Sequence, residues 1–184
     1  MSDQNFYAPP SANVEGGGSA GFGKSDHAAE LAAFVGSKSS FYLEKWGHKI
    51  NGGQGSSGFS IGAFFLGLLF FLYRKMYLYA LLLFGAQFVL VGISIGIAMA
   101  GAPEILNNIL GFGFNLFVSF KAHDWYYQHA CAKIEEAKAE GHEGAQLLQV
   151  LSERGGTNLW LPLLVMFCFV GLIFAIVALV VAVA

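Results

Sequence analysis

Long apolar runs dominate the second half of the chain and are separated by short polar segments. The run 158–184 carries no charged residue, and its 27 residues at about 1.5 Å each exceed the roughly 30 Å of a bilayer core. The run 76–101 is also long enough to cross. A third helix is expected from Glu104 or Ile105 to about Lys121, with Pro103 suited to its first turn. The pattern therefore predicts three full transmembrane helices.

A fourth apolar run, residues 59–73, is shorter and is followed directly by two basic residues. Fifteen helical residues extend only about 22 Å, so this run either spans a thinned bilayer or enters and returns to the same side. We favour return, because every Lys and Arg of the chain then lies on one side, as the positive-inside rule requires. The fold class is an all-α integral membrane helical bundle with three full spans and one short apolar helix.

The segment 26–57 is amphipathic and precedes the apolar runs. Leu31, Phe34 and Val35 share one helical face, and Gly36 is placed to end that helix. A second short helix is expected from Ser39 or Ser40, with aromatic residues beside charged ones. Such a helix either lies at the lipid headgroups or packs on the protein's own bundle. Residues 1–25 are rich in Gly, Ser and Pro, which predicts a disordered tail.

The connector between the third and last spans is polar and has high helix propensity. The third helix meets no breaker until Gly141, so one helix of about 35 residues is expected to project from the bilayer. Basic residues flanking the spans place the connector 121–156 in the cytoplasm and Ala184 outside. The chain divides into the tail 1–25, interfacial helices and linker 26–57, membrane helices with their extension 58–157, and the last span 158–184.

Composition supports a membrane protein and excludes some functions. Hydrophobic residues make up 55% of the chain and charged residues 12%, against roughly 25% charged in soluble domains. The net charge of −2 and the absence of a dense Lys/Arg block exclude a nucleic-acid partner. The sequence has no GxSxG elbow, phosphate-binding glycine loop or HExxH pair, so we expect neither an enzyme nor a cofactor.

Small and polar residues mark particular faces of the predicted spans. Small residues allow close helix packing, within the chain or as a homodimer seam, and they are Gly85, Gly92, Gly96, Gly111, Gly171 and Ala175. Polar side chains in hydrocarbon must face other helices or water, and those predicted to do so are Gln87, Ser94, Asn108 and Asn115. These polar side chains either hold the helices together by hydrogen bonds, as structural glue, or line a transport pathway.

Residues at the predicted membrane boundaries bind lipid headgroups or anchor the topology. They are Trp46, Arg74, Lys75, Trp125 and Trp160. In the connector, His123 and His129 lie near Cys131 and several carboxylates, which are residue types that ligate metals. The two histidines are six residues apart and point in different directions on a helix, so we predict no metal site.

Three stretches resemble a bacterial membrane family called domain of unknown function 2628. They are FVGSKSSFYLEKW (Phe34 to Trp46), AFFLGLLFFLYRKMY (Ala63 to Tyr77), and GFGFN with the following WYYQHACAKI (Gly111 to Ile134). The run Tyr73-Arg74-Lys75-Met76-Tyr77 is the most specific part. Family members commonly have Trp where Phe70 stands and Pro where Leu68 stands. The resemblance implies a small bacterial inner-membrane protein and no established activity.

These features together lead to two functional hypotheses. The first is a small non-enzymatic integral membrane protein that acts as an accessory or interaction subunit of a membrane complex. Its partners would be the lipid bilayer and other membrane proteins, or a second copy of itself. The alternative is an oligomeric small channel or transporter lined by Asn108, Asn115 and Gln87.

Overall fold

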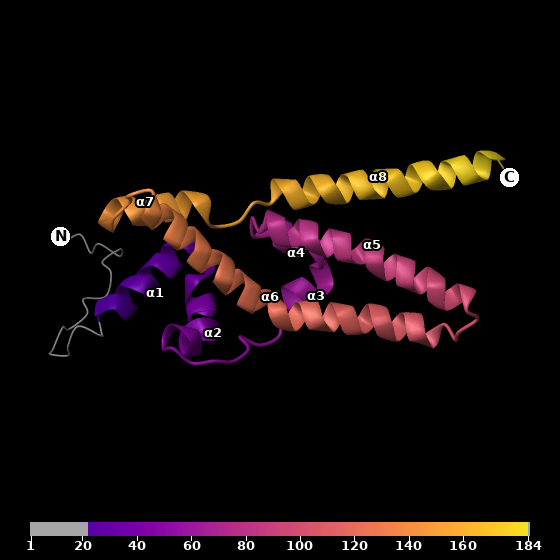
Figure 1. Cartoon of the computed structure of the whole chain (residues 1–184). Helices are drawn as coiled ribbons and strands as arrows, with labels where there is room; N and C mark the ends of the chain where they lie inside the picture. The colour runs from indigo at the N-terminus through magenta and orange to yellow at the C-terminus, as the bar shows by residue number, and fades with distance from the viewer. Residues whose placement is uncertain (1–21, 184) are drawn as a thin grey trace, which may run out of the picture.

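The computed structural model describes residues 22–183 as a set of helices joined by short connections (Figure 1). The fold is all-α, as predicted. The helices, with one 3-10 turn η1 (Gly36–Lys38), are α1 (Phe22–Val35), α2 (Ser39–Ile50), α3 (Ile61–Leu66), α4 (Leu68–Tyr73), α5 (Tyr77–Met99), α6 (Ile105–Ala139), α7 (Gly144–Arg154) and α8 (Trp160–Val183).

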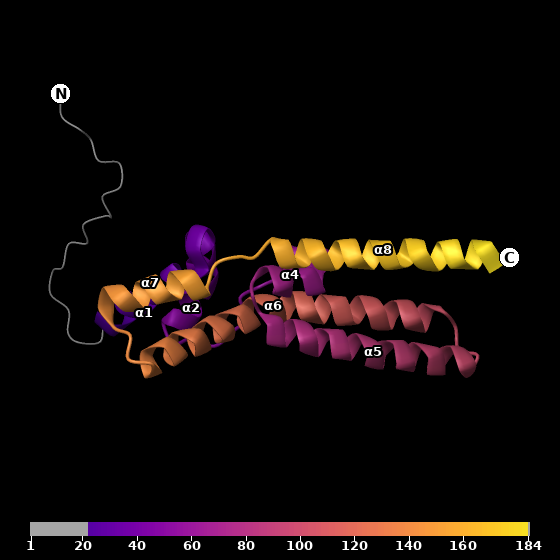
Figure 2. The ribbon, with the colours of Figure 1, turned by 90° about the horizontal axis from the view of Figure 1, so that it is seen from above.

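Length and composition allow three of the described helices to cross a membrane. They are α5, α6 and α8, which confirms the three predicted full spans. Helix α6 is a single helix of 35 residues, the length expected from the absence of a breaker before Gly141. In Figure 2, α5, the first part of α6 and α8 extend in one direction from a cluster formed by α1, α2 and α7.

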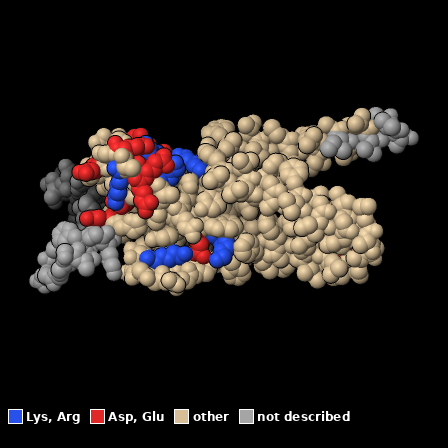
Figure 3. Space-filling view, viewed as in Figure 1, with Lys and Arg blue, Asp and Glu red and all other residues tan. Residues whose placement is uncertain are grey.

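The charged residues gather at one end of the molecule (Figure 3). In the described segments 76–120 and 155–183, Glu104 is the one charged residue. All ten Lys and Arg side chains of the chain therefore belong to residues outside the long apolar spans. We call residues 22–50 and 121–154, which carry most of these charges, the polar module.

The core of the polar module forms around α1. Leu31, Phe34 and Val35 share one face of α1, as predicted, and the structure shows that they are almost completely buried. Gly36 has φ +75° and ends the helix, since a left-handed residue with no Cβ interrupts the α-helical hydrogen bonds at low cost. Helix α1 begins at Phe22, so residues 22–25 of the predicted tail are helical, while residues 1–21 lie outside the described residues.

Helix α2 packs on the chain itself, which decides between the two alternatives for this amphipathic segment. Tyr42 and Trp46 are buried against α6, and the Trp46 Nε1 atom donates a hydrogen bond of 3.1 Å to the His123 carbonyl. The rings of Trp46 and Tyr126 have centroids 5.3 Å apart. Tyr42 and Trp46 of this amphipathic segment are therefore part of the protein core, which is the second of the two alternatives for these side chains.

The short apolar run forms two helices of six residues each, α3 and α4, where one short helix was expected. Gly67 separates them with φ +49° and ψ −121°, a conformation that a residue with a side chain rarely adopts. At the start of the run, Ser60 N donates to Ser119 O, and at its end Asn158 N donates to Tyr73 O. Both ends lie at the polar-module end of α5 and α6, so the run enters the apolar half and turns back (Figure 1). We call residues 59–75 the hairpin.

Helix α8 leaves the other helices soon after it begins. It packs on α4 near its start, and the Asn158 side chain accepts hydrogen bonds from the backbone N–H groups of Trp160 and Leu161. From Met166 onward, every residue of α8 whose side chain is described is exposed. Beyond its first turns, the last span therefore does not pack along the other described helices.

Candidate functional site

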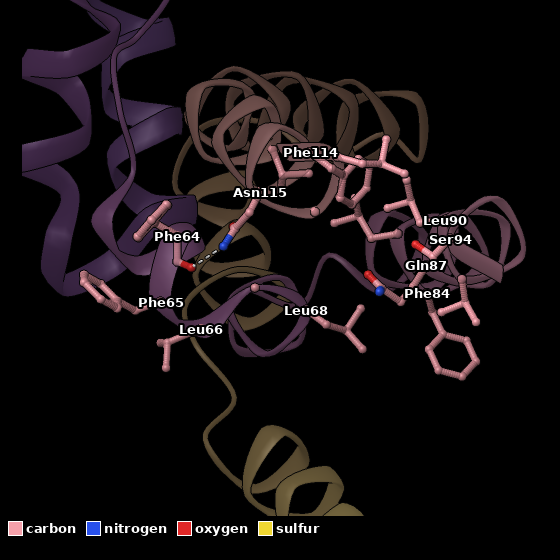
Figure 4. Close-up of a pocket in the computed structure, with 16 residues that line it drawn as sticks. Phe64, Phe65, Leu66, Leu68, Phe84, Gln87, Leu90, Ser94, Phe114 and Asn115 are labelled. Atoms are coloured by element: carbon pink, nitrogen blue, oxygen red, sulfur yellow. Dashed lines mark hydrogen bonds between the residues drawn. The ribbon is translucent and has the colours of Figure 1, made fainter. Parts of the chain in front are cut away.

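A cavity of about 450 Å³ lies in the apolar half, where the hairpin meets α5 and α6 (Figure 4). Side chains and backbone from the hairpin, α5 and α6 line it. The lining residues are Phe64, Phe65, Leu66, Gly67, Leu68, Leu83, Phe84, Gln87, Leu90, Val91, Ser94, Leu110, Gly111, Phe114, Asn115 and Val118. None of these side chains ionises near neutral pH, so the cavity offers apolar surface with a few hydrogen-bonding groups.

The break at Gly67 brings irregular backbone to this cavity. Non-helical backbone at membrane depth needs partners from protein or from a polar cavity, because lipid supplies none. Asn115 Nδ2 donates to the Phe64 carbonyl at 3.2 Å, and Ser119 Oγ donates to the Asn115 carbonyl at 2.7 Å. The predicted polar face of the third span thus holds the hairpin against α6, which supports its role as structural glue.

The cavity brings together three of the four predicted intramembrane polar residues. Gln87 and Ser94 of α5 face Asn115 of α6 across it. Asn108 is exposed and does not line this cavity, so the predicted channel lining of Asn108, Asn115 and Gln87 is not assembled within one chain. Its neighbour Asn107 is half-buried and has a buried Oδ1 atom with no hydrogen-bond partner in the described chain.

The predicted helix-packing glycines have no close partner among the described residues. A Cβ added at Gly85, Gly92, Gly96, Gly111 or Gly171 would meet no atom within 4 Å. Ala175 is exposed as well. Packing of these residues inside the bundle, the first of the two alternatives, is therefore not seen. Contact with another molecule stays a prediction.

Arg74 is buried, whereas a side chain that anchors the protein to lipid headgroups would lie at the surface. Its side chain is 5% exposed, with Cζ 4.6 Å from the Tyr42 ring centroid and 5.0 Å from that of Tyr126. Its Nε and Nη1 atoms have no hydrogen-bond partner in the described chain. Cation–π attraction to two tyrosines stabilises the buried guanidinium. Burial raises the pKa of Tyr126 to about 12, although the Arg74 charge opposes this.

The other predicted boundary residues divide into packed and exposed ones. The Lys75 ammonium donates to the Glu153 carbonyl at 3.1 Å, joining the hairpin to α7. Trp125 packs on the rings of Phe71 and Tyr79, while Trp46 is fully buried. Trp160, at the start of α8, is 84% exposed, so its side chain is free to contact the membrane–water interface.

The Asp124 carboxylate of the polar module has two structural partners. The Asp124 carboxylate accepts a hydrogen bond from Ser57 N at 2.9 Å and lies 3.0 Å from Lys49 Nζ. Burial raises the pKa of Asp124, but these two partners outweigh it and hold the pKa below its usual range. Burial lowers the pKa of His123, which keeps its imidazole neutral. This carboxylate therefore fixes the 51–58 linker to α6.

The metal-ligating residue types of the connector are not gathered. Over residues 22–183, no group of three His, Cys, Asp or Glu residues is placed to hold a metal ion. Cys131 Sγ lies 3.9 Å from His27 Nε2, and burial raises the pKa of the Cys131 thiol. A raised pKa disfavours the thiolate that metal binding or nucleophilic attack requires.

The comparisons with known proteins agree with the resemblance seen in the sequence. The model of the family described as protein of unknown function (DUF2628) matches residues 26–131, while the chain matches no curated protein and no solved structure. The matched region includes most of α1, all of α2 to α5, the hairpin, the cavity and most of α6, and it ends before α7 and α8. The buried Arg74, the hairpin break and the cavity thus lie in the shared part of the fold, and the chain belongs to the DUF2628 family.

Proposed function

We propose that this protein is a small non-enzymatic accessory or interaction subunit of a bacterial inner-membrane complex. The observation that carries the proposal is the contrast between the two halves of the molecule. The polar module has a tightly packed core, whereas the apolar windows of α5 and α8 are each only 6% buried within the chain. Two spans with so few intramolecular contacts suit association with other membrane helices.

The small-residue faces are the surfaces proposed for this association. Gly171 and Ala175 lie one turn apart on α8, and Gly85, Gly92 and Gly96 share a face of α5. Because apolar side chains gain little from leaving lipid, close backbone approach at such small residues is a main source of helix association. Partner helices would come from another membrane protein or from a second copy of this chain.

The proposed orientation follows from the charge distribution. Positively charged loops stay in the cytoplasm, and all ten Lys and Arg residues lie outside the apolar spans, on elements at the polar-module end. This supports a cytoplasmic connector 121–156 and cytoplasmic α1 and α2, with Ala184 outside. The hairpin then enters the membrane from the cytoplasmic side and returns to it.

The proposal is tested by purifying the full chain in a mild detergent and identifying stoichiometric membrane partners by mass and mass spectrometry. We expect a complex larger than the monomer, which the double variant Gly171→Leu and Ala175→Leu dissociates because leucine prevents close approach. The matched control, Val170→Leu with Val177→Leu, adds bulk on another face of α8 and should leave the complex intact. Recovery of the unmodified protein as a monomer alone would contradict the proposal.

A further inference from the structure

The cavity between the hairpin, α5 and α6 carries an unsatisfied polar group deep in the apolar half. Gln87 is ten residues after the first residue of α5, which places it about 15 Å along the helix, near the middle of a hydrocarbon core of roughly 30 Å. Figure 4 shows its side-chain amide directed toward the cavity and Leu68 of the hairpin. No hydrogen bond joins this amide to the rest of the described chain.

An unpaired amide at this depth calls for a partner from outside the chain. Burying an amide in hydrocarbon without a hydrogen bond costs about 2 kcal/mol or more. Asn115, the other amide in the lining, already donates to the Phe64 carbonyl. Gln87 therefore remains the lining amide with both donor and acceptor capacity available to a bound molecule.

The rest of the lining determines what kind of molecule fits. No Asp, Glu, Lys, Arg or His lines the cavity, so a charged group would have no counter-ion there. Leucine, valine and phenylalanine residues make up most of the lining, and the volume lies in the range of small-molecule sites. We propose that the cavity binds a neutral, membrane-soluble molecule whose hydroxyl or carbonyl oxygen accepts a hydrogen bond from Gln87 while its apolar body packs against this apolar lining.

This binding is independent of the proposed assembly, because the cavity lies within one chain. The glycine face of α5 points away from the cavity. Gln87, Val91 and Ser94 line the cavity, whereas Gly85, Gly92 and Gly96 lie on the other side of the helix and do not line it. Loss of the ligand should therefore leave association with other membrane proteins unchanged.

The experiment uses the full chain in lipid nanodiscs and two photoreactive probes of equal chain length. One is a long-chain alcohol with a diazirine, and the other is the matching diazirine alkane. Labelled peptides from α5 and α6 are counted by mass spectrometry. We expect the alcohol to label the cavity residues about fivefold more than the alkane, the ratio that one hydrogen bond of about 1 kcal/mol provides. Gln87→Leu should reduce that ratio to about one.

A pair of glycine variants separates the cavity from the lipid-facing surface. Gly111 lines the cavity, whereas Gly113 is rotated by about 200° around α6 and does not. A Cβ at either position would meet no atom within 4 Å, so both can be enlarged without a direct clash at the Cβ. Gly111→Leu should abolish alcohol labelling of the cavity, and Gly113→Leu should preserve it. Equal labelling by both probes, or labelling unaffected by Gln87→Leu and Gly111→Leu, would mean that ordinary lipid chains fill the space and would overturn the proposal.

Discussion

Replacing Trp46 with alanine measures how firmly α2 is packed on α6. The Trp46 side chain is 0% exposed, and its Nε1 atom donates to the His123 carbonyl at 3.1 Å. Its ring lies 5.1 Å from that of Tyr42 and 5.3 Å from that of Tyr126, measured between centroids. If α2 instead rested on lipid headgroups, this side chain would contribute little to the stability of the protein.

The expected loss of stability follows from this burial. Truncating a buried tryptophan to alanine costs about 3–5 kcal/mol through lost apolar contact and the cavity left behind. A buried hydrogen bond contributes about 1 kcal/mol of net stability. We therefore expect Trp46→Ala to lower the free energy of unfolding by about 4 kcal/mol. Trp46→Phe, which keeps most of the ring and loses the N–H, should lower it by about 1–2 kcal/mol.

The assay is a urea titration of the full chain in mild detergent, followed by near-UV circular dichroism of the aromatic cluster. Trp160→Ala is the matched control, because this tryptophan is 84% exposed and its loss should change stability by no more than about 0.5 kcal/mol. A cost below about 1 kcal/mol for Trp46→Ala, or equal costs for the two tryptophans, would refute the packing of α2 on α6.

Three further predictions concern the polar module and Gly155, which follows it directly. Gly155→Ala should destabilise the protein by several kcal/mol in the same titration, because the added Cβ would collide with the Phe34 carbonyl oxygen. Gly47→Ala, in an open position on α2, should be neutral or stabilising by up to about 1 kcal/mol. The lowered pKa of buried His123 means that the unfolded chain binds its proton first, so stability should fall as pH drops below the ordinary value of 6.5; His123→Phe should flatten that decline. The lowered pKa of Asp124 stabilises the fold above its ordinary value of 3.8, and unfolding titrations from pH 5 to 3 should show a loss that is smaller in Asp124→Asn.

The sequence predicted those features that depend on local chemistry or on segment length. The three spans follow from apolar length, and the end of α1 follows from Gly36, whose φ of +75° suits a residue without Cβ. The 35 residues of α6 follow from an uninterrupted run of helix-forming residues. Each of these needs no knowledge of what the segment packs against.

The break of the short apolar run depends on tertiary contacts that local sequence does not reveal. Gly67 interrupts the helix, whereas Gly85 and Gly92 remain inside α5 although their neighbours are equally apolar. The difference lies in the hydrogen bonds that receive the hairpin, from Ser60 to Ser119 and from Asn115 to Phe64. Those partners are about 50 or more residues away along the chain.

The site residues show the same division between local and distant causes. Gln87, Ser94 and Asn115, which the polar pattern marked, line the cavity, but helical phase alone did not exclude Asn108 from it. Arg74 has the sequence position of an anchor after an apolar run, yet tyrosines from two other helices bury it. The residues next to Arg74 in the sequence do not indicate that its side chain joins the hairpin to the polar module.

The central claim is that residues 59–73 turn back, so that α1 and α2 share one side of the membrane with the connector 121–156. Labelling with a membrane-impermeant maleimide tests it directly, in a chain whose Cys131 and Cys168 are replaced by serine. We predict that Ser37→Cys and Glu140→Cys react from the same side and Glu104→Cys from the other. Reaction of Ser37→Cys and Glu140→Cys from opposite sides would contradict the account.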